Sequence, residues 1–302
     1  MELPLIDAAR LGGLLTPAGA VAALEKAFAR DTSTLPERQH VDVGGGDLLL
    51  MPAWSSGAAG VKLITVTPDN PSRGLPLIHG LYVLFDKPAL RPVALIDAAP
   101  LTALRTAAVS ALATKHLARP DSGRLVIFGA GVQGRAHLAA MHDLIELESV
   151  RVVSRTHTEA ETLAAEATSW GLEAAVGTPP DVAGADLVCT CTTAAEPLFD
   201  GDLLQPGTHV NAVGSYRPEA RELDDRAIER AIVVVDTFTA LRETGDLVLP
   251  LRSGVLRRED VRALSEVLDG SGRRAAEDIT IFKSVGAAFE DLAVAEAAAA
   301  DL

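Results

Sequence analysis

Basic side chains stand in places where local stability alone would not put them. Lys62 lies inside residues 61–66, a run apolar enough for a buried strand, and a buried ammonium must pair with an anion or lose its charge. Arg105 is the only charged residue in 98–114 and is expected in the first turn of a helix, where the dipole disfavours cations. For these two, as for Arg38, the ordinary alternative is an ion pair within the chain. Together the three predict a site for an anionic ligand.

A glycine-rich turn predicts a second anion site, for the phosphates of a dinucleotide. It follows the apolar run 125–128 directly and precedes a predicted helix. In such a unit the first glycine makes the turn, the second admits the pyrophosphate and the third lets helix and strand pack closely. The phosphates then meet free N–H groups at the helix N-terminus. The residues assigned to this turn are Gly129, Ala130, Gly131, Val132, Gln133 and Gly134.

The end of the next strand distinguishes between the two nicotinamide dinucleotides. An acidic residue about 20 positions beyond the last glycine would bind the ribose 2′-hydroxyl of NAD. Ser154, Arg155 and Thr156 occupy that place, and none of them is acidic. Arginine grips phosphate oxygens with paired donors, so this triplet suits a 2′-phosphate. The sequence favours NADP(H), with NAD(H) as the alternative; a solvated arginine is the ordinary explanation.

Three further polar residues are candidates for ligand contacts. Thr190 and Thr192 follow a later strand and are placed to touch the cofactor, with turn formation as the alternative. His79 is expected to line the substrate pocket, although a core or surface histidine explains it equally well. No grouping of Cys, His, Asp or Glu has the spacing of metal ligands, so no metal is predicted.

The elements that position these residues fall into two groups. After a helix opened by Thr16-Pro17, strands at 47–51, 60–67, 75–85 and 90–96 follow one another, which indicates an antiparallel or mixed sheet. A helix over 102–117 then leads into strands 124–128, 150–154, 187–190, 209–213 and 231–235, with helices at 132–144 and 158–170. This alternation is typical of an α/β fold with a doubly wound parallel sheet. A last helix is predicted over 284–299.

Composition narrows the class of protein. The chain has 302 residues, enough for two domains, and a formal net charge of −14, which argues against nucleic acid or an anionic membrane as the main partner. Its two cysteines, Cys189 and Cys191, cannot form a disulfide framework and fit a reducing compartment. We see no signal peptide and no apolar run of about 18 residues. A cytoplasmic protein is therefore expected.

The order of the motifs makes the sequence similar to a known family. After Arg38 come Gly-Val-Lys at 60–62, Gly-Leu-Pro at 74–76, Leu-Thr-Ala-Leu-Arg-Thr-Ala-Ala at 101–108, the glycine turn, Val-Asn-Ala-Val-Gly at 210–214 and Phe-Lys-Ser-Val-Gly at 282–286. Together they resemble the ornithine cyclodeaminase/mu-crystallin family along essentially the whole chain.

The resemblance implies a homodimer of two-domain subunits. A Rossmann domain at 119–284 would lie between the two parts, 1–118 and 285–302, of an α+β domain for substrate binding and dimerisation. Arg38, Lys62 and Arg105 would hold a substrate carboxylate beside the nicotinamide. Val213 and Val285 correspond to family positions near the cofactor, the latter at the start of the last helix.

One position departs from the cyclodeaminase pattern. Family members that cyclise ornithine carry an aspartate two residues after the glycine of 210–214, and this chain has Tyr216 there. A phenol, with a pKa of about 10, is a poor base near neutrality. Asp224 and Asp225 are too far along the chain to replace the missing acid. The branch that resembles mu-crystallin also lacks it, and its members are NADPH-dependent imine reductases.

The predicted function is NADPH-dependent reduction of a cyclic 2-imino acid, of the pyrroline- or piperideine-2-carboxylate type, to a cyclic amino acid. A protonated ketimine is already electrophilic, so the protein's task is mainly orientation. Lys62 is also a candidate proton donor, and Tyr216 either hydrogen-bonds the imine nitrogen or simply packs. The alternatives are an ornithine cyclodeaminase, an amino-acid dehydrogenase or reductive aminase, and a non-catalytic NADPH-dependent binder of a small carboxylate.

Overall fold

The computed structural model describes residues 3–30 and 35–300 and divides into two compact units. One unit contains both chain ends, up to Arg105 and from Ala287 onward, and the other contains Thr106–Gly286. The division therefore falls inside helix α3 (Ala98–Leu117), and not after residue 118 as the sequence suggested. The reason is that the second half of α3 is anchored in the Thr106–Gly286 unit: Thr114 accepts a hydrogen bond from Asn211 at 2.8 Å.

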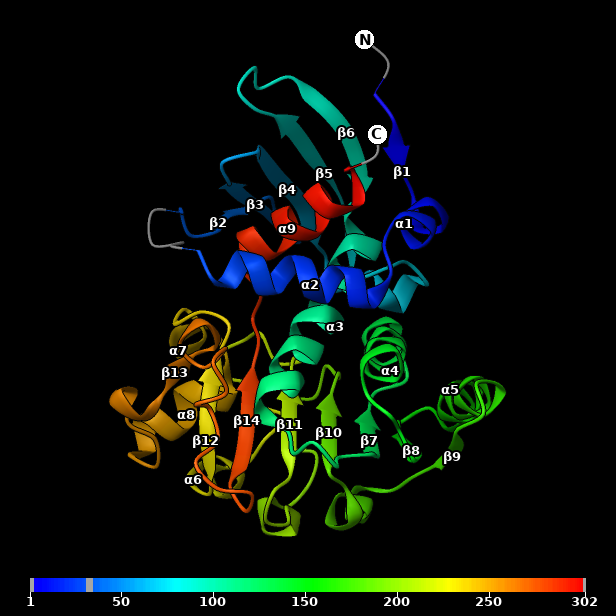
Figure 1. The fold of residues 1–302 in the computed structure, drawn as a ribbon, viewed down its shortest axis with the longest axis vertical. Coiled ribbons are helices and arrows are strands. Elements are labelled where there is room, and N and C mark those ends of the chain that lie inside the picture. The colour runs from blue at the N-terminus through cyan, green and yellow to red at the C-terminus, as the bar shows by residue number, and fades with distance from the viewer. Residues whose placement is uncertain (1–2, 31–34, 301–302) are drawn as a thin grey trace. The chain divides into compact units, whose positions relative to one another are not determined.

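The unit with both chain ends is a six-stranded mixed sheet with helices on one face (Figure 1). The sheet order is β1-β6-β5-β4-β3-β2, and only the β1–β6 pair is parallel. Its strands are β1 (Leu5–Ile6), β2 (Gln39–Asp42), β3 (Asp47–Trp54), β4 (Ala58–Val66), β5 (Ile78–Asp86) and β6 (Pro92–Asp97). Its helices are α1 (Ala8–Leu14), α2 (Pro17–Phe28) and α9 (Ala288–Ala298), and Thr16 caps α2 as predicted.

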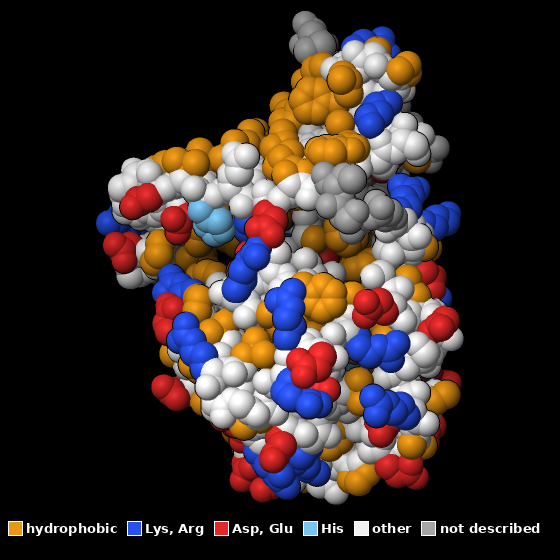
Figure 2. Space-filling view, turned by 90° about the vertical axis from the view of Figure 1, so that its left-hand side faces the viewer, with side chains coloured by type: hydrophobic (Ala, Val, Ile, Leu, Met, Phe, Trp, Pro, Cys, Tyr) orange, Lys and Arg blue, Asp and Glu red, His pale blue; other side chains and the backbone are white. Residues whose placement is uncertain are grey.

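The two faces of this sheet differ in burial. On β3 and β4, every second side chain is buried, and these buried residues share the face that α9 covers. The intervening positions are mostly apolar but less buried: Leu50 and Leu63 are half-buried and Leu81 is 41% exposed, and the three lie opposite one another across three strands. Trp54, on the same face of β3, is 45% exposed. Figure 2 shows hydrophobic side chains gathered on the surface of this unit.

The Thr106–Gly286 unit is an all-parallel sheet of eight strands with the order β13-β12-β14-β11-β10-β7-β8-β9 (Figure 1). The part β9-β8-β7-β10-β11-β14 follows the 3-2-1-4-5-6 order of a Rossmann sheet, in which ligands bind beyond the carboxyl ends near the point where the order reverses. Here that point lies between β7 and β10. The strands are β7 (Arg124–Phe128), β8 (Ser149–Val153), β9 (Glu173–Val176), β10 (Leu187–Thr190), β11 (His209–Ala212), β12 (Ala231–Val235), β13 (Arg262–Ala263) and β14 (Ile279–Lys283).

The helices of this unit connect successive strands. They are α4 (Val132–Leu144), α5 (His157–Ser169), α6 (Asp225–Glu229), α7 (Ala240–Glu243) and α8 (Gly245–Ser253). Buried apolar side chains of β7, β10, β11 and β14 pack into one core with Leu223, Leu247 and Leu256. Strands buried on both faces read as continuous apolar runs, which is why most of them are visible in the sequence.

Two predicted helix starts are wrong. Helix α3 begins at Ala98, because the Asp97 carboxylate accepts a hydrogen bond from the Ala99 N–H at 3.0 Å and caps it. Arg105 therefore lies beyond the first turn, and the dipole argument for it fails. Helix α9 begins at Ala288 and not at residue 284, because the segment before it is extended and Gly286 has a φ of +80°.

Some strands were not predicted at all. No strand is predicted at β14, which runs between β11 and β12 in the middle of the sheet. The prediction also lacks four short strands at the sheet edges, β1, β2, β9 and β13. Within residues 3–30 and 35–300, no helix has the length and apolar character needed to cross a membrane.

Candidate functional site

The glycine turn after β7 has the geometry of a phosphate-binding loop. Gly129 has a φ of +99°, which only glycine adopts readily, and a Cβ on Gly134 would lie 1.8 Å from the Gly129 carbonyl oxygen. A Cβ on Gly131, in contrast, would meet nothing within 4 Å. Gly131 is also the N-cap of α4 and offers no capping side chain. The turn therefore leaves open space at a helix N-terminus, which fits a dinucleotide pyrophosphate.

The residues after β8 lie at the neighbouring strand end. Ser154 accepts a hydrogen bond from the Thr156 N–H at 3.3 Å, which shapes the turn into α5. Arg155 is exposed, and the three residues 154–156 carry no acidic side chain. A ribose hydroxyl of NAD would find no carboxylate here, whereas the guanidinium is accessible to a phosphate.

The predicted cofactor residues after β10 and β11 lie in two adjacent loops. Thr190 is fully buried, and its hydroxyl donates to Glu222 at 2.8 Å. The Thr192 hydroxyl donates to the other oxygen of the same carboxylate at 2.8 Å. The Val213 N–H donates to the Thr190 carbonyl at 3.0 Å, which joins the loops. Both threonine hydroxyls are therefore engaged with a carboxylate that the sequence analysis had missed.

The segment around Val285 is held by another buried carboxylate. Asp236, at the end of β12, accepts hydrogen bonds from the Ser284 hydroxyl at 2.7 Å and from the Val285 and Gly286 N–H groups at 2.9 and 2.6 Å. Three donors on one oxygen fix the extended path that replaces the predicted helix start. Val285 thus lies at the carboxyl end of β14, on the edge where a Rossmann sheet binds its ligands.

The basic residues of the other unit form ion pairs with the first turn of α9. Lys62, 1% exposed, donates to Asp291 at 2.9 Å, and Arg105 donates to Glu290 at 2.8 Å. The Arg105 Nε also lies 3.2 Å from Asp291. Both acids are fully buried, and the helix N-terminus stabilises their negative charge. Lys62 and Arg105 thus lie together, and both form ion pairs within the chain, as the alternative explanation of their positions required.

The charge of Lys62 is finely balanced. Burial lowers its pKa, Asp291 opposes that effect, and the positive charges of Arg105 and Arg38 add to the lowering, with a result of about 8. Arg38 is half-buried and close enough for its charge to act on Lys62. Arg38 and Arg105 therefore both act on Lys62, the third residue predicted to bind the substrate carboxylate.

His79 is separated from that cluster, whereas Tyr82 joins it. His79 is exposed and lies on the half-exposed face of the sheet, in register with Thr65. Tyr82 lies directly across from Lys62 on the α9 face, fully buried, and its hydroxyl has no partner among the described residues. A Cβ on Gly60 would lie 2.1 Å from that hydroxyl, so glycine there makes room for the phenol. Tyr82 could not be singled out from the sequence, because an aromatic residue in a strand is common.

Tyr216 lies in the loop after β11 and is 43% exposed. The Arg217 guanidinium lies 5.4 Å from the centre of its ring, a cation–π contact. The ring thus contacts Arg217 on one side, and part of the side chain is exposed to solvent.

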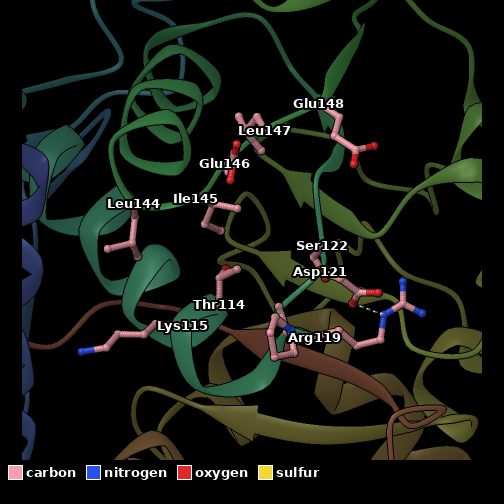
Figure 3. A pocket seen from close by; sticks show the side chains of 12 residues that line it. Thr114, Lys115, Arg119, Asp121, Ser122, Leu144, Ile145, Glu146, Leu147 and Glu148 are labelled. Atoms are coloured by element: carbon pink, nitrogen blue, oxygen red, sulfur yellow. Dashed lines mark ion pairs between the residues drawn. The ribbon is translucent and has the colours of Figure 1, made fainter.

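Figure 3 shows a cavity of about 750 Å³ that is not at this edge of the sheet. It is lined by residues 114, 115, 118–122 and 144–148, which end α3 and α4 and precede β7 and β8. Arg119 turns there toward Asp121, with which it pairs at 3.3 Å. Since ligands of Rossmann sheets bind at the carboxyl ends of the strands, this cavity is not the dinucleotide site.

Known proteins with similar sequences support the family resemblance that the motifs indicate. The model of the ornithine cyclodeaminase/mu-crystallin family matches residues 6–299. The chain belongs to this family. A Δ1-pyrroline-2-carboxylate reductase of Bacillus cereus is 40% identical over 283 residues, which cover 90% of this chain and 87% of that protein.

Solved structures share the fold over nearly the whole chain. The Thermococcus litoralis Δ1-pyrroline-2-carboxylate reductase, in complex with NADH and L-proline, superposes with a TM-score of 0.92 at 33% identity and covers 99% of this chain and 97% of its own. An archaeal alanine dehydrogenase dimer with bound NAD reaches a TM-score of 0.93 at 30% identity, with coverage of 99% and 96%. The family and the Rossmann fold predicted from the sequence are thereby confirmed.

Proposed function

We propose that this protein is an NAD(P)H-dependent reductase that converts a cyclic 2-imino acid, of the pyrroline- or piperideine-2-carboxylate type, into the cyclic amino acid. Its similarity to Δ1-pyrroline-2-carboxylate reductases over most of both chains supports the reaction class. Bound NAD(P)H supplies the hydride for the imine carbon, and the nitrogen keeps or takes up a proton.

The observation that carries the proposal is that the acidic side chains after β11 are exposed or already engaged within the protein. Between Gly214 and Asp225, a stretch that the structure describes completely, no acid is placed like the aspartate of the cyclodeaminases. Glu219 is exposed, Glu222 accepts hydrogen bonds from neighbouring loops, and Asp224 caps α6. Asp225 forms an ion pair with Arg221 at 2.8 Å. A reaction that needs a base beside the substrate nitrogen is therefore poorly served, whereas hydride transfer to an iminium is not.

Arg38, Lys62 and Arg105 are the proposed ligands of the substrate carboxylate. Lys62 and Arg105 pair with Glu290 and Asp291, and Arg38 is close enough for its charge to act on Lys62, so three cationic side chains gather where the carboxylate would bind. Lys62 is also suited to supply the proton: its pKa of about 8 leaves it mostly protonated at neutral pH yet close to release. Tyr216 is proposed as a hydrogen-bonding partner of the imine nitrogen or of a water beside it.

NADP(H) is the proposed cofactor, with NAD(H) as the alternative. The pyrophosphate would lie at Gly129–Gly134, and Ser154, Arg155 and Thr156 would bind the 2′-phosphate. The exposed guanidinium and the absence of an acid in 154–156 support this preference. Val213, Val285 and the backbone beside Thr190 and Thr192 would form the nicotinamide side.

A homodimer is proposed, with the half-exposed apolar face of the six-stranded sheet as the contact between subunits. Leu50, Leu63, Leu81 and Trp54 lie on that face, and monomeric proteins rarely leave such a continuous apolar surface open. The similar alanine dehydrogenase is a dimer. Light scattering should give twice the mass of one chain, and Leu63→Glu should shift it to the monomer.

A second candidate reaction follows from the same similarity: reductive amination of an open-chain 2-oxo acid, as in alanine dehydrogenase. Parallel assays separate the candidates. NADPH and NADH oxidation is followed with pyrroline-2-carboxylate, with piperideine-2-carboxylate, and with pyruvate plus ammonia, beside ammonia release from ornithine with NAD. Oxidation with a cyclic imine and none with pyruvate supports the reductase. Activity only with pyruvate plus ammonia, or ammonia release from ornithine without net redox change, contradicts it.

A further inference from the structure

Glu222 is a buried carboxylate that accepts five hydrogen bonds from neutral donors. One oxygen accepts from the Thr192 N–H and hydroxyl, both at 2.8 Å. The other accepts from the Thr190 hydroxyl at 2.8 Å and from the Gly214 and Ser215 N–H groups at 2.8 and 3.3 Å. The donors belong to the loop after β10 and the loop after β11, so a single side chain ties two loops together.

These two loops lie one after the other beside the glycine turn. A Cβ on Gly129 would lie 2.5 Å from the Cys191 carbonyl oxygen, so the β10 loop lies directly against the turn. A Cβ on Gly214 would lie 2.1 Å from the Thr192 carbonyl oxygen, so the β11 loop lies directly against the β10 loop. Both loops follow carboxyl ends of strands beside the point where the sheet order reverses. They therefore form the edge where a bound dinucleotide must meet the protein.

The backbone at Glu222 is bound by Asp246, which forms a buried ion pair with Lys283. The Glu222 N–H and that of Leu223 donate to Asp246 at 2.7 and 2.9 Å. Asp246 pairs with Lys283 at 2.9 Å, and all three charged side chains are fully buried. Burial raises the pKa of Glu222, Lys283 opposes that effect, and Asp246 adds to it. Lys283, at the end of β14, thus supplies the positive charge that makes a buried carboxylate at this place tolerable.

A carboxylate suits this place better than its neutral counterpart. An ionised carboxylate offers only acceptors, about four lone-pair sites, and every group that points at Glu222 is a donor. A glutamine would turn an NH₂ group toward two or three of those donors. The loops would then separate or lose hydrogen bonds. Residues at the carboxyl edge of the sheet would shift, although no group proposed to touch the ligand had been replaced.

We propose that Glu222 is a positioning residue for hydride transfer: it holds the loops 190–192 and 214–215 at the spacing that the nicotinamide requires, without contacting it. This inference rests on the proposed function. It predicts a loss in turnover, because small displacements of a reacting pair cost rate more than they cost affinity for the imino acid.

The test compares Glu222→Gln with Asp224→Asn. Asp224 is a matched control, because it also accepts backbone hydrogen bonds, from Gly201 and Ala227 at 2.9 and 2.8 Å, but at the start of α6. Glu222→Gln should lower kcat by roughly 10- to 100-fold at saturating NADPH and imine, with KM for the imine within about 3-fold. Asp224→Asn would turn an NH₂ group toward one of these two N–H donors, so it should lower the Tm and leave kcat within about 2-fold. Thr190→Val, which removes one donor to Glu222, should lower kcat by a smaller factor, on the order of 3-fold.

Equal kcat values for Glu222→Gln and Asp224→Asn would overturn the inference and leave Glu222 a purely structural residue. If Glu222→Gln does not fold, the Thr190→Val result decides in its place, and an unchanged kcat would overturn the inference. NADPH fluorescence on binding keeps the test separate from the proposed function. If the wild type binds NADPH but reduces no imine, a weaker or red-shifted nicotinamide emission in Glu222→Gln, but not in Asp224→Asn, still supports the positioning role, and identical spectra contradict it.

Discussion

The buried acids at the two candidate sites meet different kinds of partner. In the unit with both chain ends, buried cations from β4 and α3 meet buried acids from α9, and ion pairs hold the cluster. At the edge of the Rossmann sheet, Glu222 and Asp236 instead accept hydrogen bonds from hydroxyl and backbone N–H groups. A cluster of paired charges suits recognition of a charged substrate, whereas carboxylates that gather neutral donors fix the shape of loops. The comparison teaches that similar buried acids serve different tasks, according to the donors they meet.

The largest effect is expected where an ion pair of the first cluster is broken. Lys62→Met leaves Asp291 with one cationic partner fewer, and removal of one partner from a buried pair costs roughly 3–5 kcal/mol. It should also lower kcat/KM for the imine by more than about 100-fold, since Lys62 could then neither bind the substrate carboxylate nor supply the proton. NADPH binding should be unchanged, because the glycine turn belongs to the other unit. Steady-state kinetics and denaturant unfolding measure both effects, with the exposed Lys26→Met as the control.

Two glycine substitutions should separate folding from cofactor binding. Gly134→Ala places a Cβ 1.8 Å from a carbonyl oxygen and should destabilise the protein without ligand by about 1–3 kcal/mol. Gly131→Ala meets nothing within 4 Å and should leave unfolding within about 0.5 kcal/mol of wild type. It should still weaken NADPH binding by more than about 10-fold, because its methyl group enters the space proposed for the pyrophosphate. Normal NADPH affinity of Gly131→Ala would place the phosphates elsewhere.

The cofactor preference should depend on one exposed arginine. Arg155→Ala removes the proposed partner of the 2′-phosphate and should lower kcat/KM for NADPH by about 10- to 100-fold, the worth of a charge-assisted contact. The value for NADH should stay within about 3-fold, so the ratio between the two cofactors reports the effect. An unchanged ratio would remove the argument for NADP(H).

A smaller, pH-dependent effect is expected at the amino edge of the Rossmann sheet. Burial works against ionisation of Asp186, but hydrogen bonds from Arg124 and Gly123 outweigh it and lower its pKa to about 2. A lowered pKa in the folded state means that its stabilising contribution, about 2 kcal/mol, is complete above pH 4 and is lost as the pH falls through about 2. Asp186→Asn should therefore reduce stability at pH 7 more than at pH 2.5. Equal losses at both values would show that the charge contributes nothing.

One part of the site is formed by contiguous residues and could be predicted from the sequence. The other part depends on contacts between distant residues and could not. The Gly129–Gly134 turn is readable because strand, turn and helix are contiguous, and β7 and α4 begin and end as expected. Lys62 and Arg105 attracted attention as misplaced charges, but their partners Glu290 and Asp291 did not. Asp291 lies 229 residues from Lys62 along the chain. No periodicity relates such distant positions.

The Glu222 cluster escaped prediction for a related reason. Glu222 is flanked by Arg221 and Leu223 in a stretch without regular pattern, and it looks like an ordinary surface acid. Only the folded sheet places the ends of β10 and β11 around it. Likewise, β14 was missed because polar Lys283 at its end, followed by Ser284, disguises a central strand. These two residues are buried against Asp246 and Asp236.

The central claim is that a hydride passes from NADPH to the carbon of a cyclic 2-imino acid. Its most direct test is one turnover of pyrroline- or piperideine-2-carboxylate with NADPH that is deuterated at the transferred position, followed by mass spectrometry of the product. The expected product is proline or pipecolate that carries one deuterium at Cα, with one NADP⁺ formed for each product. Unlabelled product, or no product from either imine while pyruvate and ammonia give labelled alanine, would contradict it.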